Sequence, residues 1–234
     1  CVQYGGDAAG FAQFLFAVPE LVRQQPMLQV IVVHAGPAPS AADRLRAALA
    51  GGQPQLLAGV LQESELYQPL LDHLERLHSQ GRSRAWWETA ARLEPEHRVR
   101  DVGEVSREDF ASLLTLADLV VLPGLHRRCT SQLPYEALAA GVLTVARTHA
   151  GMETYARLIT EEVSGEIAVL CSLSDDRPTV WELEDKLGRF VRLRPELGDR
   201  LRGLAVRKFA ARQTAVDLQR LHGEPAARAA AVHA

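Results

Sequence analysis

Asp118-Leu-Val-Val-Leu-Pro-Gly124 decides the fold of this chain, together with the segment after it, Thr130-Ser-Gln-Leu-Pro-Tyr-Glu136-Ala-Leu-Ala-Ala-Gly141-Val-Leu-Thr-Val-Ala146. The short apolar runs at 119–122 and 142–146 are typical of strands buried on both faces, and the residues between them predict a polar loop and a helix. A short helix between two such strands makes a parallel crossover unit. Ligands of an open parallel sheet bind outside the carboxyl ends of the strands, so the loop before the helix is the expected ligand loop.

The rest of the chain repeats this alternation of strand and helix. An amphipathic helix is expected at 11–23, and later helices follow each apolar run. Strands are expected at 28–34, 97–102, 119–122, 142–146 and 166–171, after the end of a first strand at 1–6. This order predicts a Rossmann-like, doubly wound α/β domain over residues 1–222, with a mainly parallel sheet of six strands.

A long helical insertion is expected within this domain at about 41–94, where a strand-to-strand connection is usually much shorter. It serves as a lid, a partner surface or a decoration, and the sequence leaves these alternatives open. Its pair Trp86-Trp87 favours packing in the core over a surface on which a sugar stacks. The tail at 223–234 has low complexity, and we expect it to be flexible.

Charge and composition exclude several classes of function. A formal net charge of −3 gives no general attraction to nucleic acid or to an anionic membrane. Cys1, Cys129 and Cys171 lack the spacing of metal ligands and suit a reducing compartment. No apolar run approaches the roughly 18 residues of a transmembrane helix, so we expect a cytoplasmic protein, peripheral to a membrane at most. Asp175 and Asp176 have no third ligand nearby, so no metal site is expected.

The order of motifs resembles the carboxyl-terminal, donor-binding domain of retaining GT-B glycosyltransferases of family GT4, the glycosyl transferases group 1. The segments that carry the resemblance are 99–110, 117–123, 136–146, 150–153 and 164–169. The first segment resembles the strand and helix that precede the family's main motif, and the second resembles the strand at the start of that motif. The third resembles the helix of the motif and the strand after it. The last two resemble the family's Gly-rich loop and the turn and strand that follow it. The resemblance covers nearly the whole chain and is most specific over residues 95–170.

This resemblance implies one half of a GT-B fold that binds a nucleotide diphosphate sugar, the donor. Its sugar is transferred, with retained configuration, to an acceptor held by an amino-terminal domain. That acceptor domain, on the same or another chain, is the implied partner, and no cofactor or bound metal is implied. Because the first residues look like the tail of a strand, we interpret the chain as a fragment that is inactive in isolation.

The resemblance assigns the Glu-x7-Glu motif of the family to Arg128 and Glu136. Glu136 matches the second acid, which hydrogen-bonds the ribose hydroxyls, and a carboxylate suits a diol because it accepts two hydrogen bonds. An acid on a helix surface without a role is the alternative. Arg128 stands where the family has a glutamate near the reacting carbon. It is the catalytic candidate by position alone, because a guanidinium accepts no hydrogen bond.

The family's Gly-Arg…Lys-Gly signature, whose basic pair neutralises the diphosphate, appears here at 4–10 without either basic residue and with Asp7 instead. Arg127 and Arg128 are candidates for a replacement clamp on the diphosphate. A solvated basic loop is the alternative interpretation of the same residues. Losing both basic residues and the first acid weakens the case for catalysis, since stabilising the leaving group is the main contribution of such an enzyme.

Further donor-binding candidates lie at the expected ends of strands and starts of helices. They are Thr130, Ser131 and Gln132 at the start of the helix, and His149 and Gly151 in the loop after the next strand. His34 ends another expected strand at the same edge. A lone histidine in such a place is more often an ordinary loop residue than a ligand-binding group.

Three interpretations of function stay open. The first is a GT4-like donor-binding domain that is competent when joined to its acceptor domain. The second is a degenerate GT-B domain that acts as a non-catalytic binding or scaffolding module, which the altered basic and acidic positions favour. The third is an unrelated Rossmann-like nucleotide-binding enzyme, which ranks last because the ordered resemblance and the absence of a Gly-x-Gly-x-x-Gly sequence argue against it.

Overall fold

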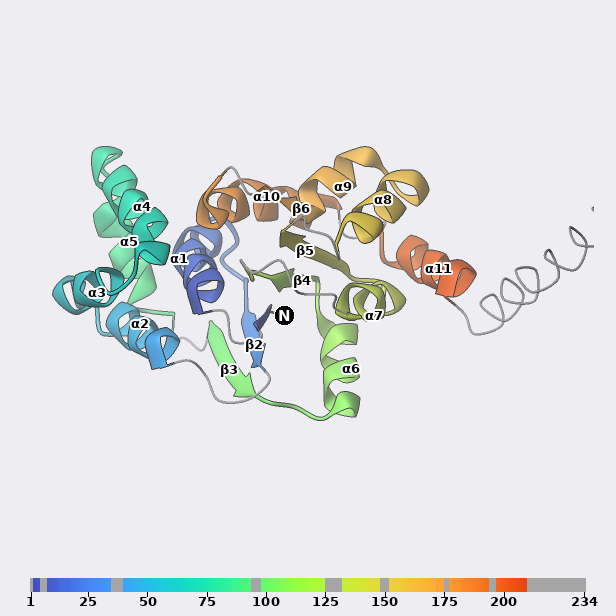
Figure 1. The fold of residues 1–234 in the computed structure, drawn as a ribbon, viewed down its shortest axis with the longest axis horizontal. Helices are drawn as coiled ribbons and strands as arrows, with labels where there is room; N and C mark the ends of the chain where they lie inside the picture. The colour runs from blue at the N-terminus through green and yellow to red at the C-terminus, as the bar shows by residue number, and fades with distance from the viewer. Residues whose placement is uncertain are drawn as a thin grey trace, which may run out of the picture.

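Six parallel strands form one sheet in the computed structural model of this protein, in the order β3-β2-β1-β4-β5-β6 (Figure 1). The structure describes residues 2–4, 8–34, 40–93, 98–124, 132–147, 152–174, 177–193 and 197–209. The strands are β1 (Val2–Tyr4), β2 (Val30–His34), β3 (Val99–Gly103), β4 (Leu119–Leu122), β5 (Leu143–Arg147) and β6 (Ser172–Leu173). The strand order changes direction between β1 and β4, which confirms the predicted doubly wound sheet.

Helices cover both faces of the sheet. Those outside the insertion are α1 (Ala8–Gln24), α6 (Arg107–Leu116), α7 (Leu133–Ala139), α8 (Glu153–Glu162), α9 (Gly165–Cys171), α10 (Thr179–Leu193) and α11 (Gly198–Phe209). Val120 of β4 packs with α6 and α7, whereas the next residue, Val121, belongs to the main core with α1 and α10. Successive side chains of a strand point to opposite faces, so these two valines show that both faces are buried.

The segment between β2 and β3 is helical and packs against α1 (Figure 1). Its helices are α2 (Ser40–Ala50), α3 (Pro54–Leu61), the short 3-10 helix η1 (Glu65–Tyr67), α4 (Gln68–Ser79) and α5 (Ser83–Ala90). Helix α3 begins at a proline, where the sequence suggests only a turn. Trp86 is fully buried, and its Nε1 donates to the carbonyl of Phe16 at 3.2 Å. Trp87 packs edge-on against Trp86, so the pair lies in the core as predicted.

Residues 166–171 differ from the prediction, because they form helix α9 rather than a strand. Ser164 caps this helix by accepting a hydrogen bond from the N–H of Glu166 at 3.2 Å. The inward side chains recur at the helical spacing of three and four, at Ile167, Leu170 and Cys171. The apolar run fits strand or helix in composition, and this spacing together with the cap favours the helix. The strand of this unit is the two-residue β6 that follows.

A buried group of charged side chains joins the insertion to α10. His73 of α4 is fully buried, and its Nε2 lies 3.6 Å from Oε1 of Glu184 on α10. Arg76 donates from Nη2 to the other oxygen of Glu184 at 2.7 Å and lies over the ring of Trp181. Burial lowers the pKa of His73 to about 3, helped by Arg76 and Arg82, and burial raises the pKa of Glu184. The imidazole is therefore neutral at physiological pH.

None of the helices in the described part of the chain is long and apolar enough to span a membrane. The tail predicted at 223–234 and the end of the last predicted helix lie outside the described residues, which stop at 209. The domain limits of 1–222 therefore stay a prediction.

Candidate functional site

The carboxyl ends of the parallel strands meet at one edge of the sheet, and the sequence predicts the ligand there. We call it the carboxyl edge. The described residues at or directly after these strand ends include His34, Gly103, Pro123, Arg147 and Ser174. They come from five strands, so the fold brings distant parts of the sequence together at this edge.

Glu136 lies on α7, the helix that follows β4 and its loop. Its side chain is 40% exposed, and Oε1 lies 3.9 Å from Nη2 of Arg107 at the start of α6, a side chain that is 89% exposed. An ion pair this long and this exposed contributes little to stability. The Glu136 carboxylate is thus near the carboxyl edge, open to solvent and available to accept hydrogen bonds from a ligand.

Gln132 immediately precedes α7 and is exposed. Its side chain makes no capping hydrogen bond, and its carbonyl accepts from the N–H groups of Tyr135 and Glu136 at 3.0 and 3.1 Å. The amide of Gln132 is therefore not required to start the helix. The other predicted site residues lie outside the described residues and stay predictions: Arg127, Arg128, Thr130, Ser131, His149 and Gly151.

A second polar cluster lies at the ends of β2 and β3. His34 Nε2 lies 3.1 Å from Oδ1 of Asp101, and Arg46 on α2 approaches Oδ2 of Asp101 at 2.6 Å. The N–H of Gly103 donates to Oδ1 of Asp101 at 3.0 Å. This mostly buried carboxylate therefore fixes the imidazole of His34 at the carboxyl edge. Sequence reasoning finds His34 but misses Asp101 and Arg46, because Asp101 follows Arg100 in a strand of mixed polarity and Arg46 is far away in the sequence.

Gly10 brings the start of α1 into contact with the end of β4. A Cβ atom on Gly10 would lie 2.1 Å from the carbonyl oxygen of Pro123 and 3.0 Å from Cα of Gly124. Only glycine allows this approach, because real Cβ atoms are not found at such distances. Gly10 is the last glycine of the segment 4–10, for which the sequence predicts a phosphate loop. The start of α1 and the end of β4 are therefore adjacent at the carboxyl edge.

Arg147, the last residue of β5, connects the carboxyl edge to α10 and α1. It is buried, and its Nη2 donates to Oγ1 of Thr179 at 2.8 Å. The N–H of Thr179 in turn donates to Oε1 of Gln13 on α1 at 2.8 Å. Sequence reasoning misses this cation, although a charged residue at the end of a fully buried strand is a usable signal. These two hydrogen bonds connect β5, α10 and α1 at the carboxyl edge.

Within the described ranges, no group of three His, Cys, Asp or Glu side chains is arranged to hold a metal ion. Cys171 is buried as a free thiol, and burial raises its pKa to about 12. A thiol with so high a pKa is a poor nucleophile at neutral pH. The chemistry of the described part of this edge is therefore that of carboxylates, imidazole and guanidinium groups.

No protein-family model matches the sequence, and no curated protein matches it. Among solved structures, the chain is similar to sucrose-phosphate synthase from Thermosynechococcus elongatus, with a TM-score of 0.52 and 18% sequence identity. The match covers 97% of this chain and 45% of that protein, so this chain spans less than half of its length. At this identity the likeness shows the fold alone, and it confirms the predicted Rossmann-like architecture of one half of a GT-B fold.

Proposed function

We propose that this chain is the donor-binding half of a retaining, GT4-like glycosyltransferase. It binds a nucleotide diphosphate sugar at the carboxyl edge and acts on an acceptor held by an amino-terminal domain. The observation that carries the proposal is Glu136, an accessible carboxylate near this edge whose nearest cationic contact, Arg107, is weak. The ordered motifs and the shared fold support the same assignment.

Glu136 is the proposed ribose ligand. Two vicinal hydroxyls donate to the two oxygens of one carboxylate, and each charge-assisted hydrogen bond is stronger than a neutral one. The residue does not have to break a strong ion pair to do so, since 3.9 Å separates it from Arg107. Gln132, exposed one turn earlier, offers an amide that both donates and accepts toward the same ligand.

We assign the neutralisation of the negative charge on the leaving diphosphate to Arg127 and Arg128. Their loop joins β4 to α7, so it follows the strand end that Gly10 touches. Two described cations at this edge, Arg46 and Arg147, already have structural partners, because Arg46 pairs with Asp101 and Arg147 binds Thr179. A planar guanidinium donates two parallel hydrogen bonds to two oxygens of one phosphate. Two arginines are therefore a chemically suitable replacement for the missing basic pair.

A non-catalytic binding module is the second candidate, and one observation favours it. Arg128 stands at the position of the acid that the family places near the reacting carbon. A guanidinium that cannot accept a hydrogen bond from the donor sugar removes one of the groups that such an enzyme uses. In this case the nucleotide binds through Glu136, and no sugar is transferred.

Turnover of the nucleotide sugar separates the two candidates. For this experiment the chain is fused to an amino-terminal acceptor domain. The release of nucleoside diphosphate from the nucleotide sugar is then measured for the wild type and for Glu136→Ala. The control is Glu88→Ala, which removes an exposed carboxylate on the insertion. The proposal expects turnover that falls at least about tenfold in Glu136→Ala alone. Binding without turnover supports the module, and equal turnover in all three proteins contradicts the site.

A further inference from the structure

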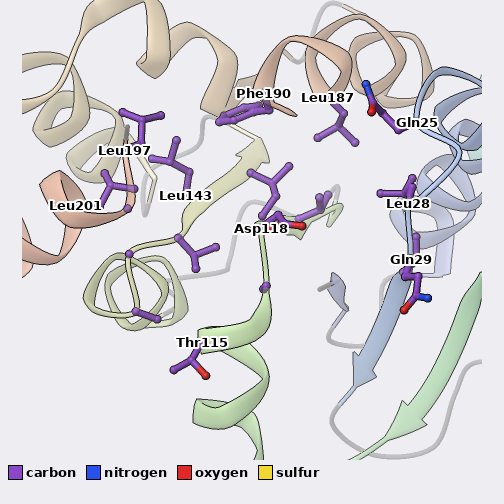
Figure 2. Close-up of a pocket in the computed structure, with 18 of the residues that line it drawn as sticks. Gln25, Leu28, Gln29, Thr115, Asp118, Leu143, Leu187, Phe190, Leu197 and Leu201 are labelled. Carbon is purple, nitrogen blue, oxygen red and sulfur yellow. The ribbon is translucent and has the colours of Figure 1, made fainter. Parts of the chain in front are cut away.

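The amino edge of the sheet, opposite the carboxyl edge, has a large pocket and a small one. The large pocket is mainly apolar, with Leu187 and Phe190 among its walls (Figure 2). The small pocket, of 200 Å³, is lined by Arg23, Arg92 and Arg98, and we call it the arginine pocket. We propose that the arginine pocket binds a small phosphate ligand, either inorganic phosphate or the phosphoryl group of a small ester. This inference goes beyond the proposed function and does not depend on nucleotide binding.

Three separate parts of the chain bring these arginines to one pocket. Arg23 lies in the last turn of α1, Arg92 lies just after α5, the last helix of the insertion, and Arg98 directly precedes β3. The N–H of Arg98 donates to the carbonyl of Leu93 at 2.7 Å, and its carbonyl accepts from the N–H of Val30 at 2.7 Å. The pocket therefore lies where the insertion rejoins the sheet, at the starts of β2 and β3.

The described lining of the arginine pocket contains three cationic side chains and no acidic one. Nη1 of Arg23 donates to Oε2 of Glu20 at 2.9 Å, and the same oxygen pairs with Arg82, so one carboxylate serves two guanidinium groups. Nε of Arg92 donates to the backbone carbonyl of Glu88 at 3.1 Å, which is a neutral partner. Among the described residues, no carboxylate pairs with Arg92. The described residues around the pocket therefore carry an excess of positive charge, which an anion would neutralise.

The lining also specifies the chemistry and the size of the ligand. A guanidinium donates two parallel hydrogen bonds to a carboxylate or a phosphate, and the higher charge of phosphate suits three arginines better. The volume of 200 Å³ is below the roughly 300–1,000 Å³ of pockets that enclose drug-sized ligands, so a whole nucleotide does not fit. The buried Leu93 and the partly buried Val22 form apolar walls, which exclude water and strengthen each charge interaction.

Binding at the arginine pocket has a structural consequence for the insertion. Helix α5 docks on α1 through Trp86, whose Nε1 donates to a backbone carbonyl of α1. A phosphate that accepts hydrogen bonds from Arg92 and also from Arg23 and Arg98 would tie the end of α5 to α1 and β3 as well. The amide groups of residues 89–93 should therefore open less often when the ligand is bound.

Isothermal titration with inorganic phosphate and, separately, with glycerol 3-phosphate tests the proposal in a chloride buffer of constant ionic strength. Wild type is compared with Arg92→Gln and Arg23→Gln, each of which removes one exposed guanidinium of the pocket. The matched control is Arg207→Gln, which removes the same charge from an exposed arginine of α11 that does not line the pocket. Circular dichroism verifies that each variant is folded, and amide hydrogen exchange of the peptide 89–93 with and without ligand locates the site.

The proposal expects a ligand that binds wild type and Arg207→Gln equally and slows exchange in the peptide 89–93. Its affinity should fall by about tenfold or more in Arg92→Gln and in Arg23→Gln, because each loses hydrogen bonds between charged groups. Tighter binding of glycerol 3-phosphate would assign the pocket to a phosphorylated small molecule, and tighter binding of inorganic phosphate would assign it to phosphate itself. Equal affinity in all four proteins would overturn the proposal, because the anion would then bind elsewhere. The absence of binding by both ligands would overturn it as well.

Discussion

Oε1 of Glu136 lies 3.9 Å from Nη2 of Arg107, so the helices that follow β4 and β3 meet through two solvent-exposed charges near the carboxyl edge. A contact this long does not explain why an acid occupies this position, since exposed pairs contribute about 0–1 kcal/mol. Its place in the first turn of α7 favours an acid in general, and the proposed function adds a ligand that binds the carboxylate. Glu136 is therefore expected to matter for binding and to be dispensable for folding.

Glu136→Ala is expected to change the free energy of unfolding by less than about 0.5 kcal/mol, because the higher helix propensity of alanine offsets the loss of this weak pair and of an acid in the first turn of α7. Urea unfolding of wild type, Glu136→Ala and Arg107→Ala measures it. A loss of more than about 1 kcal/mol in Glu136→Ala would instead give the residue a structural role, and its effect on binding would need another explanation.

Gly10→Ala is expected to destabilise the protein by about 1–3 kcal/mol, because the new methyl group would lie 2.1 Å from the carbonyl oxygen of Pro123. Gly59→Ala is the matched control. A Cβ at Gly59, inside helix α3, would meet nothing within 4 Å. Alanine there should stabilise by about 0.5–1 kcal/mol through helix propensity. Equal effects of the two changes, measured by urea unfolding, would contradict the close contact between α1 and β4.

Trp86→Phe is expected to cost about 1–3 kcal/mol of unfolding free energy. The change removes the hydrogen bond from Nε1 to the carbonyl of Phe16 and leaves a cavity in the fully buried contact between α5 and α1. Trp87→Phe, at a partly buried position, should cost less. If the two losses in urea are the same, the insertion does not dock through Trp86 as described.

His73 makes stability depend on pH. Its pKa is lowered to about 3 by burial, so the unfolded chain binds a proton below about pH 6.5 that the folded chain does not bind. Stability therefore falls as pH drops from about 6.5 toward 3. Glu184 acts in the opposite direction, because burial raises its pKa and its contribution is lost as pH rises through the carboxyl range.

The variant His73→Gln tests this dependence, since glutamine does not titrate. Wild type is expected to lose on the order of 2 kcal/mol between pH 7 and pH 4.5 from this residue, and the variant is expected to lose less over the same interval. Urea unfolding at the two pH values gives both numbers. The same loss in the two proteins would show that groups other than His73 cause the acid sensitivity.

The sheet is largely predictable from the sequence, because its central strands are continuous apolar runs bounded by turn residues. The strand expected at 119–122 occurs with these limits, and that expected at 142–146 is shifted by one residue. The run at 166–171 misleads, because after Glu166 it contains no proline or polar residue that separates strand from helix. Its capping residue, Ser164, is the signal in the sequence that favours a helix, and the exposed Val169 between buried neighbours shows the helical period in the structure.

The candidate site is less predictable, because its polar contacts join residues far apart in the sequence. Arg46 and Asp101 are 55 residues apart, and Gln13 and Thr179 are 166 apart. No local pattern connects such pairs; only the order of strands in the sheet does. Glu136 is accessible to sequence reasoning because its place after a strand, a loop and a helix start is a local pattern that a known family shares.

Isothermal titration of this chain with UDP, GDP and ADP, and with the matching nucleotide sugars, tests the central claim most directly. Wild type, Glu136→Ala and the control Glu88→Ala are compared. The account predicts that one nucleotide binds and that its affinity falls about tenfold or more, or about 1.4 kcal/mol, in Glu136→Ala alone. Binding of equal strength in all three proteins, or no binding of any nucleotide, would contradict a donor site at Glu136.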